Sequence, residues 1–353
     1  MPTNYNGQLR SNEIFAAIYN MIISQQVFAD NIAGTNAQLV DKARVDGSLY
    51  GDTKLYYATD ALKSSAWGND AEAANLLKLY RPKDPSCQAI YLDKFRQIAL
   101  TTDDYLTKRA WSTEGAFSSF NSVMKGWIRD TKRIYDSTTY NCYFGTAEST
   151  VGKQSQEITI SSEAGAGNEA QQIADFVADL MVEMTDVSRD FNDYGYLRSY
   201  NPEDIHIVWK ASVVNKMRHI DLPVIYHKDG VEKTLDMGTW LPDRYFGKVQ
   251  SAATPGDGTT VRSLIEQEIG SNHYFAGDLI KSGDTAPANT SYKTDDTILC
   301  KIYVKLPPYM SAFEVATSFF NSKSLSSNDY LTFGHNTLQY LYNYPLVTIR
   351  KSA

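Results

Sequence analysis

The feature that most constrains this chain is a long stretch of helical periodicity that begins after Thr113. Between about residues 114 and 140, apolar side chains recur at steps of three and four, with polar and basic side chains on the other faces. The apolar positions are Phe117, Phe120, Met124, Trp127, Ile128, Ile134 and Tyr135. Such a helix would measure roughly 40 Å at about 1.5 Å per residue, which is typical of a strut. The alternative is an ordinary core helix broken near Gly126, because a glycine inside a helix costs about 1 kcal/mol.

The segment before this helix indicates two strands joined by a long irregular connection. Residues 47–67 turn to Tyr, Thr, Gly and Ser, and residues 88–100 alternate, with Ile90, Leu92 and Ile98 on one face. A two-stranded excursion is marginally stable alone, so it needs another surface to contact. The sequence therefore predicts an extended two-stranded loop.

The N-terminal part predicts a flexible arm followed by a helix. Residues 1–9 are polar and indicate the arm. Ser11 or Asn12 can cap the helix that follows. Its apolar positions are Ile14, Phe15, Ile18, Met21 and Ile22.

A small α/β unit is predicted after the long helix. Residues 145–168 are rich in Gly, Ser, Thr and Glu, and we place a domain boundary there. Asn168 and Gln171 match a capping box at the start of an amphipathic helix that runs to about Val187. A compact apolar strand at residues 203–209 and a short helical run then complete the unit.

The C-terminal part alternates strands, loops and one helix. In chain order the pattern predicts a hairpin of Leu222–Tyr226 and Val231–Leu235 around Asp229-Gly230, loops at 251–260 and 281–296, a strand at Ile298–Leu306, a helix at Ala312–Phe320, and a last strand at Leu346–Ile349. The strand at 298–306 has the clearest alternation in the chain, with Ile298, Cys300, Ile302, Val304 and Leu306 between Leu299, Lys301, Tyr303 and Lys305.

Composition argues against several classes of protein. Lys and Arg total 34 against 41 Asp and Glu, so the net charge of -7 disfavours a dedicated nucleic-acid binder. The three cysteines lie far apart, which indicates neither a disulfide framework nor a zinc site. The sequence contains no run of about eighteen apolar residues, so it predicts no membrane span. The 24 tyrosines fit protein interfaces and pleated sheets equally well.

Each candidate for chemistry has a structural interpretation that the sequence favours. Gly165-Ala166-Gly167-Asn168-Glu169-Ala170 resembles a dinucleotide fingerprint, but the segment before it is too polar for a strand buried on both faces. His206 lies on an apolar strand, where a structural imidazole is favoured. Asp103-Asp104 and Asp295-Asp296 lie at element ends, where solvated caps are common. We therefore predict no catalytic, cofactor-binding or metal site.

Three segments, in this order of elements, carry a family resemblance. They are Tyr91-Leu92-Asp93-Lys94-Phe95-Arg96-Gln97-Ile98-Ala99-Leu100-Thr101-Thr102-Asp103-Asp104, Asn201-Pro202-Glu203-Asp204-Ile205-His206-Ile207-Val208-Trp209, and the strand from Tyr344 to Arg350. The chain resembles the major capsid (head) proteins of tailed bacteriophages, with the Hong Kong 97-type fold. The resemblance implies an α+β fold with an N-terminal arm, an extended two-stranded loop, a long spine helix, a peripheral sheet and an axial α/β domain.

The resemblance also implies domain boundaries. They are residues 1–46 for the N-terminal arm and helix, 47–101 for the extended loop, 102–150 for the spine helix and peripheral domain, 151–235 for the first part of the axial domain, and 236–353 for the axial remainder, loops and return strands to the peripheral domain. The strand from Tyr344 to Arg350 is expected among those return strands.

The implied function is structural. Copies of the chain would form hexamers and pentamers of an icosahedral shell around packaged double-stranded DNA, with scaffolding and portal proteins as further partners and only weak contact with the DNA. The protein would belong to the virion and assemble in the host cytoplasm, with no membrane and no cofactor. The expected contacts between subunits are Tyr56, Tyr57, Trp67 and Arg96, and the expected anchors of the spine helix are Trp127 and Ile128.

Two other functions remain open at the level of sequence. An encapsulin-like compartment or another virion protein belongs to the same structural class, and a cargo peptide or neighbouring phage genes would discriminate it. A cytoplasmic α/β enzyme belongs to a different class, and dinucleotide binding by a soluble monomer would support it.

Overall fold

The structure is a computed structural model that describes residues 37–47, 53–64, 79, 81–103, 114–161, 168–218, 238–251, 285–286, 290–336, 338 and 340–352. The helices in these ranges are α2 (Gln38–Ala43), α5 (Glu114–Thr146), α6 (Glu169–Thr185) and α7 (Ala211–Lys216), with 3₁₀ turns η1 (Pro202–Asp204) and η4 (Asp243–Tyr245). The strands are β1 (Arg44–Asp46), β2 (Thr53–Ala58), β3 (Ser86–Asp103), β4 (Ser155–Ile158), β5 (His206–Lys210), β6 (Gly238–Leu241), β7 (Gly247–Ser251), β8 (Thr285–Ala286), β9 (Thr290–Thr294), β10 (Ile298–Tyr303), β11 (Tyr309–Asn321), β12 (Ser326–Asn336) and β13 (Leu346–Lys351).

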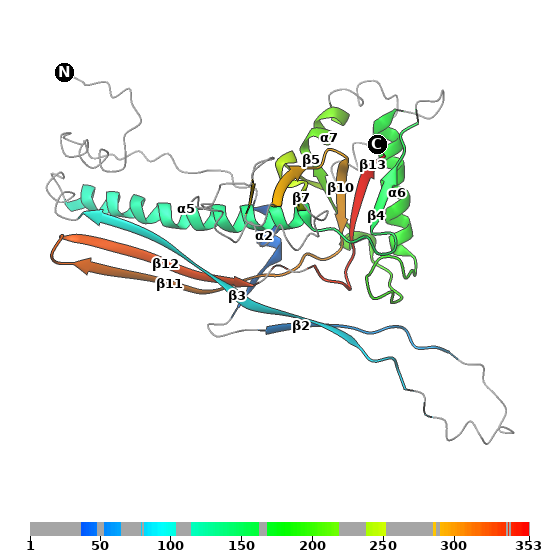
Figure 1. The fold of residues 1–353 in the computed structure, drawn as a ribbon, viewed down its shortest axis with the longest axis horizontal. Coiled ribbons are helices and arrows are strands. Elements are labelled where there is room, and N and C mark those ends of the chain that lie inside the picture. The colour runs from blue at the N-terminus through cyan, green and yellow to red at the C-terminus, as the bar shows by residue number, and fades with distance from the viewer. Residues whose placement is uncertain are drawn as a thin grey trace.

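The predicted long helix is confirmed as α5, which runs unbroken through Gly126 and ends at Thr146. Its 33 residues span roughly 50 Å. The alternative of a helix broken at Gly126 is therefore wrong. Figure 1 shows α5 lying along the first sheet and continuing to the second.

The first sheet has the strand order β1-β11-β12-β3-β2, and α5 packs on one of its faces. Ile128 and Tyr135 of the helix form a buried cluster with Leu331 and Phe333 of β12. The outer residues of β3 complete this contact, since Ile98 and Leu100 pack against the same cluster.

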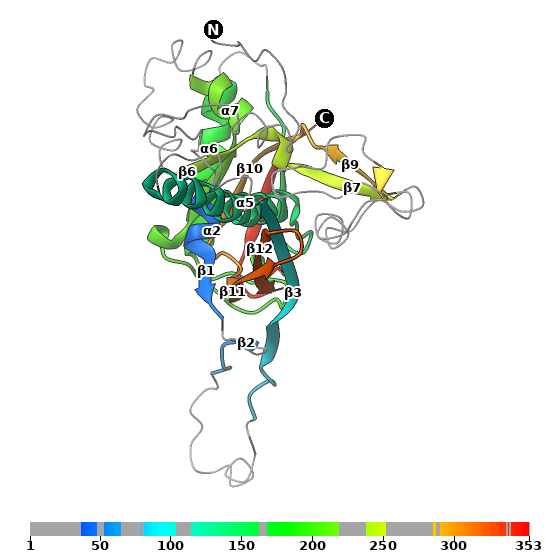
Figure 2. The same ribbon diagram turned by 90° about the vertical axis from the view of Figure 1, so that its left-hand side faces the viewer.

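The two strands predicted for this excursion are present as β2 and β3, and β3 has two different partners. The first part of β3 pairs antiparallel with β2, from Ser86 opposite Ala58 to Tyr91 opposite Thr53. The second part, from Leu92 to Asp103, pairs antiparallel with β12. Because β3 continues through both pairings, the paired β2 and β3 extend from the first sheet as a narrow ribbon (Figures 1 and 2).

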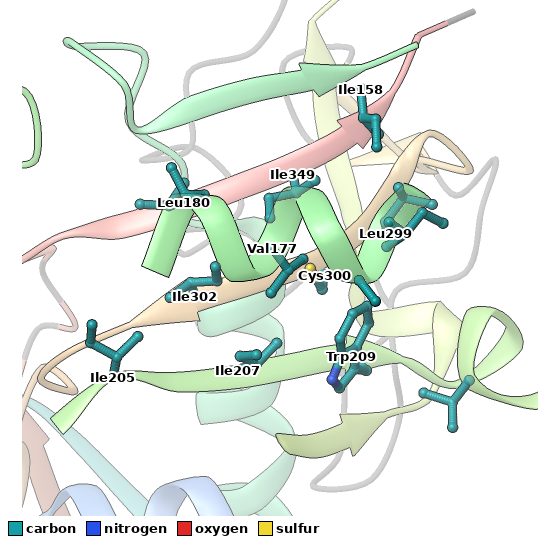
Figure 3. Close-up of a cluster of buried hydrophobic side chains, with 14 of the residues drawn as sticks. Ile158, Val177, Leu180, Ile205, Ile207, Trp209, Leu299, Cys300, Ile302 and Ile349 are labelled. Atoms are coloured by element: carbon teal, nitrogen blue, oxygen red, sulfur yellow. The ribbon is translucent and has the colours of Figure 1, made fainter. Parts of the chain in front are cut away.

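The second sheet, β4-β13-β10-β5-β6, includes β5, the strand of the predicted α/β unit, beside strands from later in the chain. The capping box of Asn168 and Gln171 begins α6, as predicted. Figure 3 shows Val177 and Leu180 of α6 over Ile302 of β10 and Ile349 of β13. A matching cluster covers the opposite face of this sheet.

Helix α5 supplies that second cover. Tyr140 and Phe144 near its C-terminus are buried together with Val208, Tyr303 and the α2 segment. The central strand β10 is consequently buried on both faces along its whole length. Helix α5 therefore packs against both sheets and connects them, as expected of a strut.

The predicted helix at Ala312–Phe320 is wrong, because these residues belong to strand β11. Apolar residues of this segment happen to lie three and four apart, and a short apolar run does not distinguish helix from strand. The segment pairs antiparallel with β12 from Ser311 opposite His335 to Asn321 opposite Ser326. Partners far away in sequence decide its conformation, as is usual for strand formation.

Other boundaries also differ from the predictions. Residues 285–286 and 290–294 form β8 and β9, which pair with β7 in a three-stranded sheet, although 281–296 was expected to be a loop. The strand β13, expected to return to the sheet of the long helix, lies in the second sheet between β4 and β10. The strands that return to the first sheet are β11 and β12.

The segment expected as N-terminal arm and helix, residues 1–46, includes residues that the structure buries. Within residues 37–46, Leu39 and Val40 of α2 belong to the cluster that covers the second sheet. The following strand β1 pairs parallel with the start of β11. The predicted helix of residues 11–22 and the hairpin at 222–235 lie outside the described residues.

Candidate functional site: the ribbon and its anchors

His206 and Asp295, which the sequence analysis considered as catalytic or metal-binding candidates, both contact other side chains of the fold. The imidazole of His206 lies 5.3 Å from the ring of Tyr303, and burial lowers the pKa of this histidine. Asp295 accepts hydrogen bonds from the backbone N–H and hydroxyl of Thr297 and from Arg350, and these donors, against the effect of burial, hold its pKa at about 2. No group of three or more His, Cys, Asp or Glu among the described residues could hold a metal ion.

The ribbon, defined as β2 and residues 86–91 of β3, presents an apolar outer face. Leu55 is 51% exposed and Tyr57 is 63% exposed. They lie opposite Ala89 and Cys87, and the exposed Tyr91 continues the same face. Exposed aromatic and aliphatic side chains gathered on one thin element are typical of a protein interface.

The inner face of the ribbon packs on its own chain. Tyr56 contacts the buried cluster of Ile90, Met310 and Leu341. The ammonium group of Lys305 lies 5.3 Å from the centre of the Tyr56 ring. Of the two adjacent tyrosines, Tyr56 therefore packs the ribbon against Met310 and Leu341, and Tyr57 faces outward.

A polar clasp fixes the ribbon to the loop that follows α6. Asp60 accepts hydrogen bonds from the backbone N–H of Leu197 at 3.1 Å and from the Nη1 atom of Arg189 at 3.0 Å. Arg198 donates to the carbonyl oxygen of Thr59 at 2.7 Å. The sequence prediction missed this clasp, because nothing in the pattern around Asp60 indicates partners 129 and 137 residues away.

The charge of Asp60 makes the clasp depend on pH only under strongly acidic conditions. The hydrogen bond from Leu197 and the guanidinium of Arg189 lower the pKa of Asp60 to about 2, from an ordinary value of 3.8. Because the folded pKa is lowered, the clasp is fully present above about pH 3.8 and is lost as the pH falls towards 2.

Replacing Asp60 with alanine is expected to loosen the ribbon, because Leu197 and Arg189 lose their common acceptor. Amide hydrogen exchange should become several-fold faster in residues 53–60 and 86–91 and stay unchanged in β10. The matched control is Asp84→Ala, since Asp84 is an exposed carboxylate near the same end of the ribbon. Equal exchange in the two variants between pH 5 and 8 would show that the clasp does not hold the ribbon.

The other predicted contact residues lie in different surroundings. Arg96 is partly buried, with its guanidinium carbon 5.8 Å from the centre of the Tyr135 ring. Ile128 is buried between α5 and the first sheet. Trp127 is 46% exposed, so its role as an anchor of the helix stays a prediction. Trp67 lies outside the described residues.

A buried polar network attaches α5 to the first sheet and to β1. The carboxylate of Asp136 accepts hydrogen bonds from the Nζ atom of Lys132 at 2.9 Å, from the hydroxyl of Tyr309 at 2.6 Å, and from Arg44 at 3.4 Å. Beside it, the Nδ1 atom of the fully buried His335 donates to the carbonyl oxygen of Asn336. The four-residue spacing of Lys132 and Asp136 was the only sign of this network in the sequence.

The chain resembles known proteins in structure and not in sequence. No family model matches the sequence, and no curated protein matches it. The chain is similar to one in the capsid structure of Staphylococcus phage Andhra, with a TM-score of 0.66 and 10% identity over 94% of this chain and 88% of that chain.

Two further solved structures have similar chains. One is the structure of the head fiber and inner core protein of native bacteriophage P68, with a TM-score of 0.64 and 11% identity over 92% of this chain and 87% of that chain. The other is the asymmetric unit of the bacteriophage PhiM1 mature capsid, with a TM-score of 0.50 and 8% identity over 94% and 91%. The chain therefore has a mixed α+β fold of the kind found in phage capsids. Among the helices that the structure describes, none is long and apolar enough to cross a membrane.

Proposed function

We propose that this chain is the major capsid protein of a tailed bacteriophage, with the Hong Kong 97-type fold, and that it assembles into the icosahedral head shell around packaged double-stranded DNA. The observation that carries the proposal is the similarity to a phage capsid structure over 94% of the chain. The ribbon supports it, because its outer face is apolar and exposed in the single chain. A shell subunit needs such a surface, since its function lies in contacts with its copies.

The proposal assigns a role to each part of the fold. Helix α5 is the spine helix, and the first sheet with its return strands β11 and β12 is the peripheral domain. The second sheet with α6 and α7 is the axial domain. The ribbon is the extended loop, and its outer face, with Tyr57 at the centre, contacts a neighbouring subunit.

The proposed partners follow from the shell. Copies of the chain form hexamers and pentamers, and scaffolding and portal proteins take part in assembly in the host cytoplasm. The net charge of -7 keeps contact with packaged DNA weak, because a surface that bound phosphate tightly would carry excess positive charge. We propose a purely structural role, without catalytic activity.

Electron microscopy of the full chain, purified alone and with its phage scaffolding protein, tests the proposal. We expect closed particles, sheets or capsomer-sized rings, with a matching large species in size-exclusion chromatography. The double variant Leu55→Ser/Tyr57→Ser should remain folded but lose these assemblies, because it removes the apolar outer face of the ribbon.

The matched control is Val182→Ser/Val187→Ser, which changes two apolar residues that are 69% and 60% exposed elsewhere on the surface. This control should assemble normally. A chain that stays monomeric or dimeric under every condition, including with the scaffold, contradicts the proposed function. Equal assembly of both double variants contradicts the role of the ribbon face.

A further inference from the structure

Strand β11 leaves most of one edge of the first sheet without a strand partner among the described residues. On one side it pairs with β12 along its length. On the other side β1 covers only Tyr309, Met310 and Ser311. Residues 313–321 therefore present a row of backbone N–H and C=O groups to whatever lies beside them.

Gly47 is the last described residue beside this edge. The backbone N–H of Gly47 makes the last hydrogen bond of the pairing, to the carbonyl oxygen of Ser311 at 3.1 Å. A Cβ atom at Gly47 would lie 2.9 Å from the Cβ of Ala312, so a side chain there would crowd the edge. The next described strand, β2, lies at the opposite edge of the sheet.

The free edge lacks the features that usually protect edge strands. Between residues 313 and 321 the sequence contains no proline, and Glu314 is its single charged residue. Val315 is 36% exposed, Phe319 is 63% exposed and Phe320 is 52% exposed, so apolar side chains are open on both faces of the strand. An exposed strand of this composition is a template for pairing with another strand.

Helix α5 does not close the edge. A groove of about 390 Å³ separates it from β11, with Lys125 and Arg129 on the helix side and Glu314 on the strand side. Ile128 and Leu331 contribute apolar surface to this groove. The groove leaves room beside β11 on the face that the helix covers elsewhere.

We propose that residues 313–321 pair antiparallel with the same residues of a second copy, about a two-fold axis through Thr317. This inference rests on the proposed self-assembly, and it names one surface and one partner for it. A two-fold axis between antiparallel edge strands stands perpendicular to the sheet, so each face of one sheet continues as the same face of the other. Residues that meet must then lie on the same face.

The position of the axis follows from the limits of the free segment. Thr317 is the midpoint of residues 313–321, so an axis there lets the whole free edge of each copy find a partner. It places Val315 opposite Phe319 of the second copy, and Phe319 opposite Val315, on the face away from α5. Aromatic and β-branched residues directly opposite each other are favourable cross-strand pairs. Both exposed side chains are covered by the same contact.

On the face towards α5, the pairing places Glu314 beside an apolar side chain of the second copy. Ala316 and Glu314 lie on this face, since Ala316 pairs with Leu331, which packs under the helix. The axis through Thr317 places Glu314 opposite Phe320 of the second copy, towards the groove that Lys125 lines. Glu314 keeps a countercharge within its own chain, since its carboxylate lies 3.8 Å from the Nζ atom of Lys132.

Cysteine cross-linking of assembled particles tests the register. In a Cys87→Ser background, which removes the exposed native thiol, Thr317→Cys should form a disulfide-linked dimer on mild oxidation, because the two copies of residue 317 lie directly opposite. The matched control is Thr332→Cys on the central strand β12, which should remain unlinked.

Charge exchange at the same position gives a second test. Thr317→Lys in every copy places two ammonium groups side by side, and Thr317→Glu places two carboxylates, so each variant alone should lose the dimer contact. A one-to-one mixture of the two should restore it, because lysine then faces glutamate. A merely structural effect of either substitution would not be rescued by mixing.

The outcomes separate this inference from the proposed function. Particles that form without cross-linking at Thr317 above the control overturn the edge pairing and leave the shell proposal standing. Cross-linked dimers rescued by charge exchange, in a protein that never forms larger assemblies, support the edge pairing and contradict the shell. A chain that stays monomeric under all conditions overturns both.

Discussion

The Asp136→Asn variant is expected to unfold with a free energy lowered by about 3–5 kcal/mol, because it removes the common acceptor of a buried network. The side chain of Asp136 is 2% exposed and that of Lys132 is 7% exposed. Without the carboxylate, the ammonium group of Lys132 keeps its burial and loses its nearest countercharge. The hydroxyl of Tyr309 loses its ionised acceptor at the same time.

The consequence reaches beyond stability, since this network holds together three parts of the fold. Lys132 and Asp136 come from α5, Arg44 from β1 and Tyr309 from β11. A weakened network should therefore let the helix move relative to the first sheet. We expect the Asp136→Asn variant to assemble poorly at temperatures at which the wild-type subunit is still folded.

Urea denaturation of unassembled subunits at pH 7 measures the effect, at a protein concentration low enough to exclude stabilisation by assembly. The control is Asp130→Asn on the same helix, which should change the free energy of unfolding by less than about 0.5 kcal/mol. The double variant Lys132→Met/Asp136→Asn should recover part of the loss, because it leaves no buried charge without its partner. A loss below about 1 kcal/mol for Asp136→Asn would mean that the network contributes little.

The Lys301→Met variant is expected to lower the free energy of unfolding by about 2–3 kcal/mol, because it removes the group that caps the C-terminus of α5. The ammonium group of Lys301 donates to the carbonyl oxygens of Phe144 at 3.2 Å and Ala147 at 2.6 Å. Carbonyl groups at the end of a helix lack partners within the helix and carry partial negative charge. Methionine keeps most of the volume and supplies no donor.

Thermal and urea denaturation of Lys301→Met, compared with Lys323→Met, measures this contribution. Lys323 is exposed in the turn between β11 and β12, so its replacement should have little effect. Hydrogen exchange should locate the change, with faster exchange in the last turns of α5 and in β10. Unchanged stability would mean that relief from burying an ammonium group offsets the lost hydrogen bonds.

The candidate site was only partly predictable. Tyr57 is exposed on the outer face of the ribbon, so its contact with a neighbouring subunit stays a prediction. Tyr56 was assigned the same role, yet it packs on Met310 and Leu341, because side chains alternate between the faces of a strand. The clasp at Asp60 and the free edge of β11 had no signal in the sequence, since each depends on which distant segments the fold brings together.

The sequence by itself determined the elements whose burial repeats along the chain: helix α5, the capped helix α6, and the strands β3, β5 and β10. Only the tertiary structure decided that residues 309–321 form a strand, that β13 joins the second sheet, and that Lys301 is buried against the end of a helix. The physical reason is that periodicity reports which side of an element is apolar, whereas the partners of a strand or a buried charge come from distant parts of the chain. Those partners also decide which surfaces remain open for assembly.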